Sequence, residues 1–303
     1  MSVVVRPLRE ADLEAAQSVH RLAFAKFFGL DPASFRPGNR TLATRAASHP
    51  DGGLVAEEDG VLVGSAVTMS WGRVAVVGPV TVHPDRWSAG IGRALMRAAV
   101  DRIDAGNFDH AVLFTHPQSA THLRLYESFG FWSGQLTAVL NLSIDATHGL
   151  AGGVRRVDQK ARWIEVGECK DIAAAVYPGL DLTREIEGLE RQKLGAVVGV
   201  DGGFAICHFG PGSEARDGAL YVKFAAVRPG DEKSFLALID AIEAQAARLG
   251  ATRVTLGVNC ARRGAYRALK SRGYRVEQFG VNMHRPDGPG RDLPDRYVID
   301  DLR

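Results

Sequence analysis

The sequence predicts an α/β protein built from two similar domains. Its 303 residues exceed the usual size of a single domain, so two domains of about 150 residues are expected. Short apolar runs alternate with amphipathic helical patterns. The order helix, strand, helix, ending in a glycine and an aromatic residue, also occurs twice along the chain.

A glycine-bearing turn at residues 82–93, VHPDRWSAGIGR, is the most informative segment. The apolar run Val74–Val82 leads into it as a strand, and an amphipathic helix follows it. A helix start presents unpaired main-chain N–H groups and the positive end of the helix dipole, which together bind anions. Small side chains let phosphates approach the main chain closely, so the turn predicts a pyrophosphate site. The small residues of the turn are Ser88, Ala89, Gly90 and Gly92.

Other interpretations of the two glycines remain open on this segment alone. A P-loop needs a Lys followed by Ser or Thr after the second glycine, where this chain has Arg93-Ala94. A dinucleotide-binding fingerprint needs a third glycine, and none follows Gly92 at the required spacing. An ordinary tight turn that begins a helix is the remaining alternative.

The segments after the turn narrow these alternatives. A short apolar strand at 111–114 precedes a helical segment at 119–131, which reads SATHLRLYESFGF. The succession of strand, VHPD, glycine turn, helix, strand and helix with LYESFGF resembles the core of the GNAT superfamily of acetyl-CoA-dependent N-acetyltransferases. The resemblance covers about residues 3–142 and begins with VVVRPLREADLEAA, which is similar to that family's first strand and helix.

The resemblance implies a mixed, mostly antiparallel twisted sheet flanked by helices, with acetyl-CoA as the cosubstrate. In that family the pantetheine arm lies where the fourth strand, here Val74–Val82, separates from the fifth, here about 111–115. Gly78-Pro79 within the fourth strand predicts a bulge, because proline cannot donate to the strand ladder. The residues expected to bind acetyl-CoA are Val80, Thr81, Val82, Trp87, Ser88, Ala89, Gly90, Ile91, Gly92, Arg93 and Ser119.

Trp87 departs from the family pattern. The turn of the family usually begins with Gln or Arg at this position, and in this chain Arg86 lies one residue earlier. Because main-chain donors dominate such a site, we expect cofactor binding to persist with a changed side-chain contact.

Tyr126 stands where the family has its usual general acid, which implies that its hydroxyl protonates the departing thiolate. A tyrosine that only packs its ring in the core is the alternative. No residue identifies itself as the general base, but His116 directly follows the fifth strand and is one candidate for it. His83 is expected to orient its turn, and Glu57 and Glu58 to be solvated beside a hairpin; an ordered water chain could replace a base.

The second half repeats the first weakly. Val227-Arg228-Pro229 echoes Val82-His83-Pro84, and Gly273-Tyr274 echoes Gly130-Phe131. A repeat that spans half the chain implies two similar domains. We place their junction near Asp145–Val157, where glycines cluster.

We therefore expect an acetyltransferase domain at 1–145 and a degenerate GNAT-like domain at 155–303. In the second copy the glycine turn is reduced to Gly230, followed by the acidic Asp231 and Glu232, which would repel a pyrophosphate. The position of Tyr126 is taken by Leu269, with Tyr266 one turn earlier as a weak substitute. An irregular tail is expected at 286–294 and a terminal strand at 297–299.

Other polar residues of the second half receive structural interpretations. Cys207 and His208 are adjacent on a strand and point to opposite faces, so we expect a buried cysteine and no catalytic pair. Asn259 and Arg262 could line a pocket with Tyr266, but helix capping followed by a solvated surface is the favoured interpretation.

Charge and composition exclude several classes of function. A net charge of +2 and 46% hydrophobic residues indicate a globular protein without a nucleic-acid or membrane-binding patch. The longest apolar run is too short to span a bilayer, and the first ten residues lack a signal-peptide pattern. The cysteines Cys169, Cys207 and Cys260 are widely spaced, which favours reduced thiols in a cytoplasmic protein without a metal. The sequence leaves a homodimer open.

The predicted activity is transfer of an acetyl group from acetyl-CoA to a primary amine of a small molecule or peptide. The acceptor is expected to enter near the loop at Phe27–Arg40. Two alternatives remain: a CoA-binding sensor or assembly module without turnover, and a tandem acyltransferase similar in architecture to mycothiol synthase.

Overall fold

The computed structural model describes residues 3–33, 35, 40–144, 164–300 and 302. We call residues 3–144 the first unit and residues 164–302 the second unit. The first unit contains β1 (Val3–Pro7), α1 (Leu13–Phe28), α2 (Thr41–Ser48), β2 (Gly53–Glu58), β3 (Val61–Trp71), β4 (Val74–Val82), α3 (Ile91–Ala105), β5 (His110–Thr115), α4 (Ala120–Glu127) and β6 (Trp132–Ser143). The second unit contains α5 (Val166–Val176), α6 (Thr183–Gln192), β7 (Gly195–Val200), β8 (Gly203–His208), β9 (Ala219–Val227), α7 (Glu232–Arg248), β10 (Arg253–Asn259), α8 (Arg263–Ser271), β11 (Arg275–Arg285) and β12 (Val298–Asp300).

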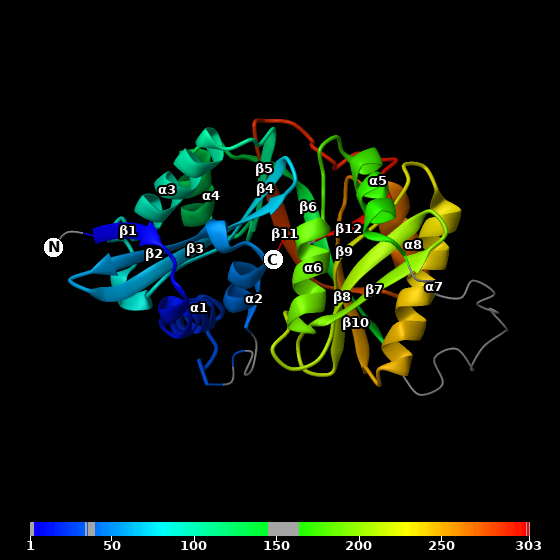
Figure 1. Ribbon diagram of the computed structural model, residues 1–303, viewed down its shortest axis with the longest axis horizontal. Helices are drawn as coiled ribbons and strands as arrows, with labels where there is room; N and C mark the ends of the chain where they lie inside the picture. Colours follow the sequence, from blue (N-terminus) through cyan, green and yellow to red (C-terminus); the bar gives the residue numbers. More distant parts are fainter. Residues whose placement is uncertain (1–2, 34, 36–39, 145–163, 301, 303) are drawn as a thin grey trace.

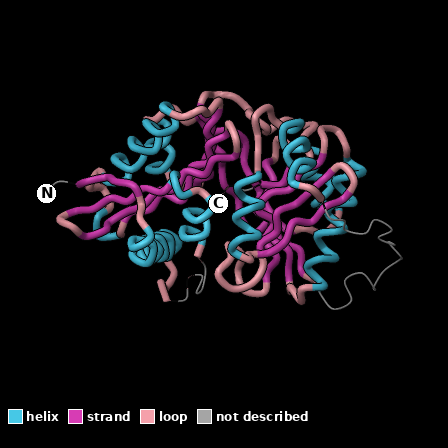
Figure 2. Tube along the Cα trace, in the orientation of Figure 1, coloured by secondary structure: helices cyan, strands magenta, loops and turns pink. Residues whose placement is uncertain are grey.

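All the described strands belong to one continuous twisted sheet with helices on both faces (Figures 1 and 2). Its order is β1-β2-β3-β4-β5-β11-β6-β10-β9-β8-β7, with β12 paired to β9 beside this path. Only the pairs β4–β5 and β9–β10 are parallel among the described strands. The predicted mixed, mostly antiparallel α/β fold is therefore confirmed.

The two units exchange strands at the centre of the sheet. Strand β11 of the second unit lies between β5 and β6 of the first unit (Figure 1). In return, β6 lies between β10 and β11 of the second unit. Each unit therefore completes its sheet with a strand that the other supplies. The apolar pattern of the sequence predicts strands but not which strands pair, so it could not predict this exchange.

Apolar periodicity explains how the elements around the glycine turn form. Helix α3 buries Ile91, Leu95, Met96 and Ala99 on one face, at the spacing of an amphipathic helix. Strand β4 is buried through its first half, as expected for a strand covered by helices on both faces.

Aromatic packing joins the units on one face of the sheet. Trp71 at the end of β3 and Phe224 on β9 lie 5.7 Å apart in an edge-to-face arrangement, within a hydrophobic cluster drawn from both units. Helices α2 and α6 pack against each other across this boundary (Figure 1). The junction expected at Asp145–Val157 lies outside the described residues.

A buried ion network also crosses the boundary between the units. Glu185 of α6 accepts hydrogen bonds from Trp71 Nε1 at 2.8 Å and pairs with Lys223 Nζ at 2.9 Å. Glu214, in the loop between β8 and β9, binds Lys223 Nζ at 2.6 Å and Arg45 Nη2 of α2 at 2.7 Å. Because each buried carboxylate meets more than one donor, the network compensates much of the cost of burying its charges.

Several polar groups of the second unit are buried, as Cys207 was expected to be. Burial raises the pKa of the Cys207 thiol to about 12, which keeps it protonated and inert. Asn259 Oδ1 accepts from the Ala261 N–H in the turn after β10. The expected helix cap is wrong, because α8 begins at Arg263 without a side-chain cap. The solvated surface expected at Arg262 is wrong, because this side chain is fully buried and binds Asp292 and Asp300 in the C-terminal segment.

Glu57 and Glu58 also differ from expectation. They were expected to be free in solvent beside the hairpin, but Glu57 pairs with Arg6 of β1 and Glu58 Oε2 lies 2.5 Å from Arg86 Nε. Long arginine side chains from neighbouring segments reach them, which local sequence cannot show.

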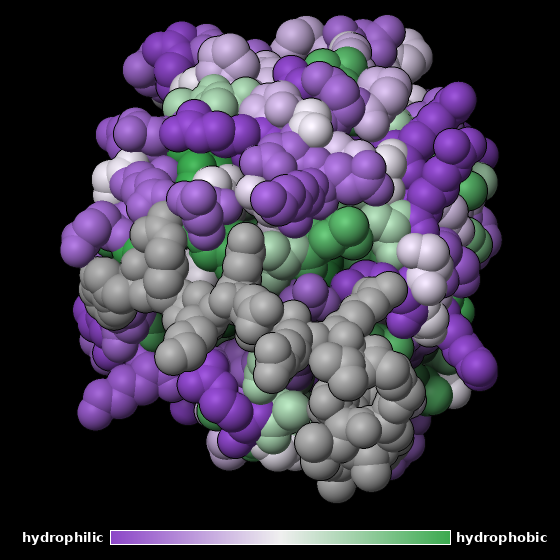
Figure 3. Space-filling model, turned by 90° about the vertical axis from the view of Figure 1, so that its right-hand side faces the viewer, coloured by the Kyte–Doolittle hydropathy of each residue, from purple (hydrophilic) through white to green (hydrophobic). Residues whose placement is uncertain are grey.

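The outer face of the second unit is mostly hydrophilic, with a few apolar residues showing between the polar ones (Figure 3). Within the described ranges, no helix combines the length and the apolar composition needed to cross a bilayer. The described side chains also include no group of three or more His, Cys, Asp or Glu that could hold a metal ion.

The strand exchange predicts that a fragment of residues 1–145 does not fold alone. Without β11, the facing edges of β5 and β6 lose their common partner, and both become exposed edges. We expect circular dichroism to show no cooperative thermal transition for this fragment. Mixing it with a fragment of residues 155–303 should restore the transition. A sharp melt of the 1–145 fragment alone, near that of the full chain, would contradict the exchange.

The buried imidazoles predict a loss of stability in acid. Burial lowers the pKa of His110 and that of His208 to about 4. The unfolded chain takes up these protons near pH 6.5, so the native state becomes less stable as the pH falls from 6.5 towards 4. Each imidazole contributes a loss on the order of 3 kcal/mol over this interval.

Unfolding by urea at pH 7, 5.5 and 4.5 measures this loss. His208→Asn should remove about half of the pH dependence of the unfolding free energy, because His110 still contributes its share. His83→Asn, which changes a partly exposed imidazole, should leave the pH dependence unchanged. Equal unfolding midpoints at the three pH values would refute the prediction.

Candidate active site

A bulge separates β4 from β5 at the expected place. The two strands pair in parallel only from Val74 to Val77, level with His110–Leu113. The register between β3 and β4 then shifts, and Gly78 adopts a φ of +145°, which glycine tolerates. Beyond Val77, no described strand pairs with β4 on the β5 side. The main chain of residues 78–82 therefore has no partner strand on the β5 side among the described strands, and we call this place the wedge.

The glycine turn follows at the open end of this wedge. Ser88 and Gly90 have φ values of +68° and +82°, which turn the chain sharply into α3 at Ile91. A Cβ added at Gly90 would meet nothing within 4 Å, so the main chain there is open to a ligand. The first N–H groups of α3, which begins directly after Gly90, have no acceptor within the helix.

Trp87 acts as a brace for the turn. Its indole Nε1 donates to the carbonyl oxygen of Val82 at 2.9 Å, although the ring is 44% exposed. His83 Nδ1 accepts from the Asp85 N–H at 3.3 Å, which confirms its expected role in orienting the turn. The Arg86 side chain is directed away to Glu58. The residue that departs from the expected pattern thus ties the turn to the end of β4.

Helix α4 places Tyr126 beside the same strand. The helix begins at Ser119, whose Oγ accepts from the His122 N–H at 3.4 Å. Tyr126 is half-buried and packs, with Val80 of β4, against the cluster under α3. Burial raises the pKa of its hydroxyl to about 12, so the phenol keeps its proton at neutral pH. Tyr126 and the end of β4 therefore lie in one region of the fold.

His116 and His122 belong to a chain of aromatic rings next to Tyr126. The His122 ring lies 6.4 Å from that of Tyr126 and 5.2 Å from that of Phe27, on which it stacks. His116 is buried, 5.2 Å from Phe27 and in edge contact with Phe28. Burial lowers the pKa of His122, which favours a neutral imidazole.

Sequence reasoning missed His122. The available signal was its spacing of four residues from Tyr126, which puts both on one face of α4.

In the loop where the acceptor was expected, Phe27 and Phe28 belong to α1, while residues 34 and 36–39 lie outside the described residues.

Comparison with known proteins finds a similarity for this part of the chain. Residues 16–131 match the family model of the acetyltransferase (GNAT) family. This segment is therefore similar to the acetyltransferase domains of that family. No curated protein matches the chain in sequence.

Solved structures extend the likeness in fold to nearly the whole chain. A Pyrococcus horikoshii protein described as a candidate acetyltransferase matches with a TM-score of 0.73 at 17% identity, covering 99% of this chain and 95% of that chain. A GCN5-related N-acetyltransferase from Sphaerobacter thermophilus matches with a TM-score of 0.61 at 17% identity, covering 93% and 95%. One from Anabaena variabilis gives 0.57 at 13% identity, covering 97% and 75%. The fold thus spans roughly two GNAT-like units.

The second GNAT-like unit fills the place where the first has its wedge. There β9 and β10 pair in parallel only from Ala219 to Tyr221. Strand β12 then pairs with β9 along Phe224–Ala226, in the middle of the molecule (Figure 1). At the start of α7 the Asp231 carboxylate accepts from the Ser234 N–H at 2.9 Å. The chain's own residues therefore occupy both the wedge and the helix start.

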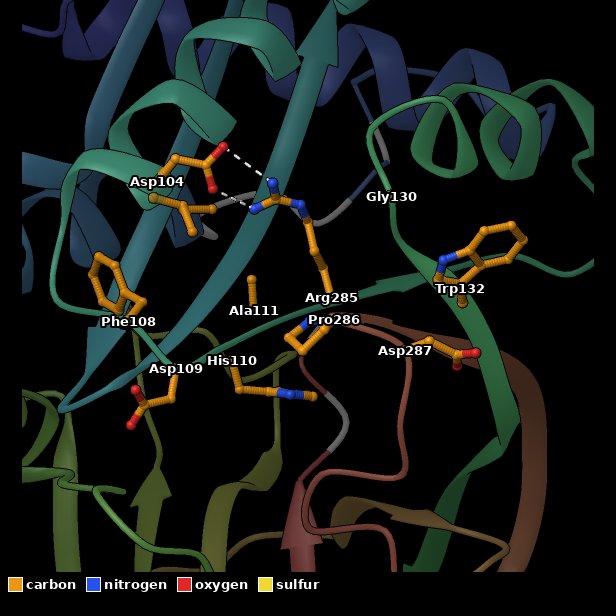
Figure 4. A pocket seen from close by; sticks show the side chains of 11 residues that line it. Asp104, Phe108, Asp109, His110, Ala111, Gly130, Trp132, Arg285, Pro286 and Asp287 are labelled. Carbon is orange, nitrogen blue, oxygen red and sulfur yellow. Dashed lines mark hydrogen bonds and ion pairs between the residues drawn. The ribbon is translucent and has the colours of Figure 1, made fainter.

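A surface pocket of about 490 Å³ lies elsewhere (Figure 4). It borders His110 at the beginning of β5, and the ion pair of Asp104 with Arg285 stands at its wall. Because His110 is level with Val74, the pocket lies about 26 Å along β4 from the glycine turn. It is separate from the wedge between β4 and β5.

Proposed function

We propose that the protein is an N-acetyltransferase that moves the acetyl group of acetyl-CoA to a primary amine of a small molecule or peptide. The reaction takes place in an N-terminal domain at 1–145, and the domain at 155–303 is a degenerate copy without a cofactor site. The observation that carries this proposal is the open wedge of β4 and β5 ending in the glycine turn of α3.

The residues present fit coenzyme A. The main chain of Ser88–Arg93 offers amide donors and the helix dipole to the pyrophosphate, with no side chain at Gly90 to block it. Val80–Val82 offer main-chain groups to the pantetheine amides, as a neighbouring strand would. Trp87 contributes by bracing the turn, and Ser119 by starting the helix that carries Tyr126.

Acetyl transfer requires these residues to stabilise an oxyanion and to assist two proton transfers. A main-chain donor at Val80–Val82 stabilises the oxyanion that forms when the amine attacks the thioester carbonyl. Tyr126 gives its proton to the sulfur as the C–S bond breaks, which its raised pKa makes available at neutral pH. The proton that the amine loses passes to water or to a neutral imidazole, for which His116 and His122 are the candidates. The proton taken from the amine then returns to the Tyr126 oxygen. The products are the amide and CoA with its thiol protonated, and the residues regain their starting protonation states.

One molecule of CoA per chain is expected. In the second unit β12 and the Asp231 carboxylate occupy the corresponding positions, and a carboxylate there opposes a pyrophosphate. The three cysteines, Cys169, Cys207 and Cys260, form no disulfide with one another, which supports our proposal of a cytoplasmic protein.

Gly90→Glu tests the cofactor site. The added carboxylate would stand in the opening of the turn, and the positive φ adds strain, so we expect calorimetry to show CoA binding weakened by about 100-fold or more. Gly230→Glu is the matched control, because Gly230 has a φ of +78° and equally open surroundings in the second unit. It should leave affinity and a stoichiometry of one unchanged. Absence of heat from CoA with folded wild-type protein would overturn the proposal.

Tyr126→Phe tests the general acid. Loss of the hydroxyl should lower turnover by about 10- to 100-fold, since a thiolate is a good leaving group, while CoA affinity stays the same. Thiol release from acetyl-CoA in the presence of a panel of primary amines measures turnover. Tyr266→Phe on the corresponding helix of the second unit should have no effect. Full activity of Tyr126→Phe would remove the residue from the mechanism.

A further inference from the structure

The bulge that opens the wedge is held by an arginine from another element. Arg45 of α2 donates from Nη1 to the carbonyl oxygen of Gly78 at 3.1 Å. Proline follows this carbonyl and has no N–H, so the first main-chain donor after the bulge is that of Val80. Any rotation of the Gly78-Pro79 peptide would change the direction of the donors that follow it.

The second unit fixes this arginine. Glu214 Oε2 accepts from Arg45 Nε at 3.1 Å and from Nη2 at 2.7 Å, and its other oxygen binds Lys223. The side chains of Arg45, Glu214 and Lys223 are only 1%, 3% and 5% exposed. A guanidinium fork held on two nitrogens has little freedom, so its third nitrogen is aimed at one carbonyl.

The network of Arg45, Glu214 and Lys223 stays ionised at neutral pH although it is buried. Burial alone would raise the pKa of Glu214, but the charges of Arg45 and Lys223 lower it to about 2. Glu185 pairs with Lys223 from the other side, so cations and anions alternate from Arg45 through Glu214 and Lys223 to Glu185. The network therefore keeps its charges, and its hold on Gly78, at neutral pH.

We propose that Arg45 is a positioning residue for acetyl transfer. Its clamp on the Gly78 carbonyl sets the aim of the main-chain donors at 80–82. Glu214 and Lys223 hold the clamp from the second unit, which thereby takes part in the reaction without binding a cofactor. This inference rests on the proposed function.

Arg45→Lys and Glu214→Gln test the clamp. A lysine keeps the charge at position 45, but one ammonium cannot both replace the fork on Glu214 and reach Gly78. Glutamine keeps the shape of Glu214 and loses its charge. Arg272→Lys is the matched control, because Arg272 is 8% exposed and forks between Asp240 and Glu243 of α7, away from β4.

Hydrogen exchange read by mass spectrometry gives a readout that needs no acceptor. In wild type, acetyl-CoA should protect both the segment 76–82 and the segment 88–95. In Arg45→Lys and Glu214→Gln, protection of 88–95 should persist while that of 76–82 is lost. Turnover should fall by about 10- to 100-fold, by a larger factor than the CoA affinity, which is the pattern of a misplaced transition-state donor.

The outcomes separate the two proposals. If acetyl-CoA protects neither segment in wild type, the proposed function fails. If it protects 76–82 equally in wild type and in both variants, the clamp is refuted and the proposed function stands. If both variants fail to fold while Arg272→Lys folds, the network is structural only and the inference is overturned.

Discussion

The separation of β4 from β5 after Val77 is the constraint on which the site depends. A parallel pair of strands that continued to Val82 would bond its main-chain groups to itself and leave none for a ligand. The bulge at Gly78-Pro79 ends the pairing, and the same strand then runs on into the glycine turn. Donors for an extended ligand and donors for an anion are thus presented in series along one segment of chain.

The two units show what closes such a wedge. Both pair their parallel strands for only a few residues, but the second unit covers the gap with β12 and caps its helix with Asp231. The C-terminal segment that carries β12 is anchored by Arg262, which binds Asp292 and Asp300 in the protein interior. In the second unit, main-chain pairing that a ligand would otherwise supply is therefore met by the protein itself.

The exchange of β6 and β11 makes the pair of units one structure. Each strand adds its hydrogen bonds to a sheet edge of the other unit, and Trp71 with Phe224 fills the space between their helices. Because the sheet is continuous, Glu214 of the second unit can contact Arg45 beside the wedge of the first unit. Arg45 joins the Glu214 carboxylate to the Gly78 carbonyl, and the side chains of Arg45 and Glu214 are both buried.

The sequence by itself determined the local elements: the strand at Val74–Val82, the bulge, the turn and the amphipathic helix after it, because periodicity, proline and glycine act over a few residues. It also marked Tyr126 and the acidic replacement at Asp231. Only the tertiary structure decided that β11 lies between β5 and β6, that β6 lies between β11 and β10, and that Arg262 is buried. It likewise decided that β12 fills the second wedge. Such pairings join residues far apart in the chain. The apolar pattern of a strand predicts that the strand is buried, but it does not predict which segment packs against it.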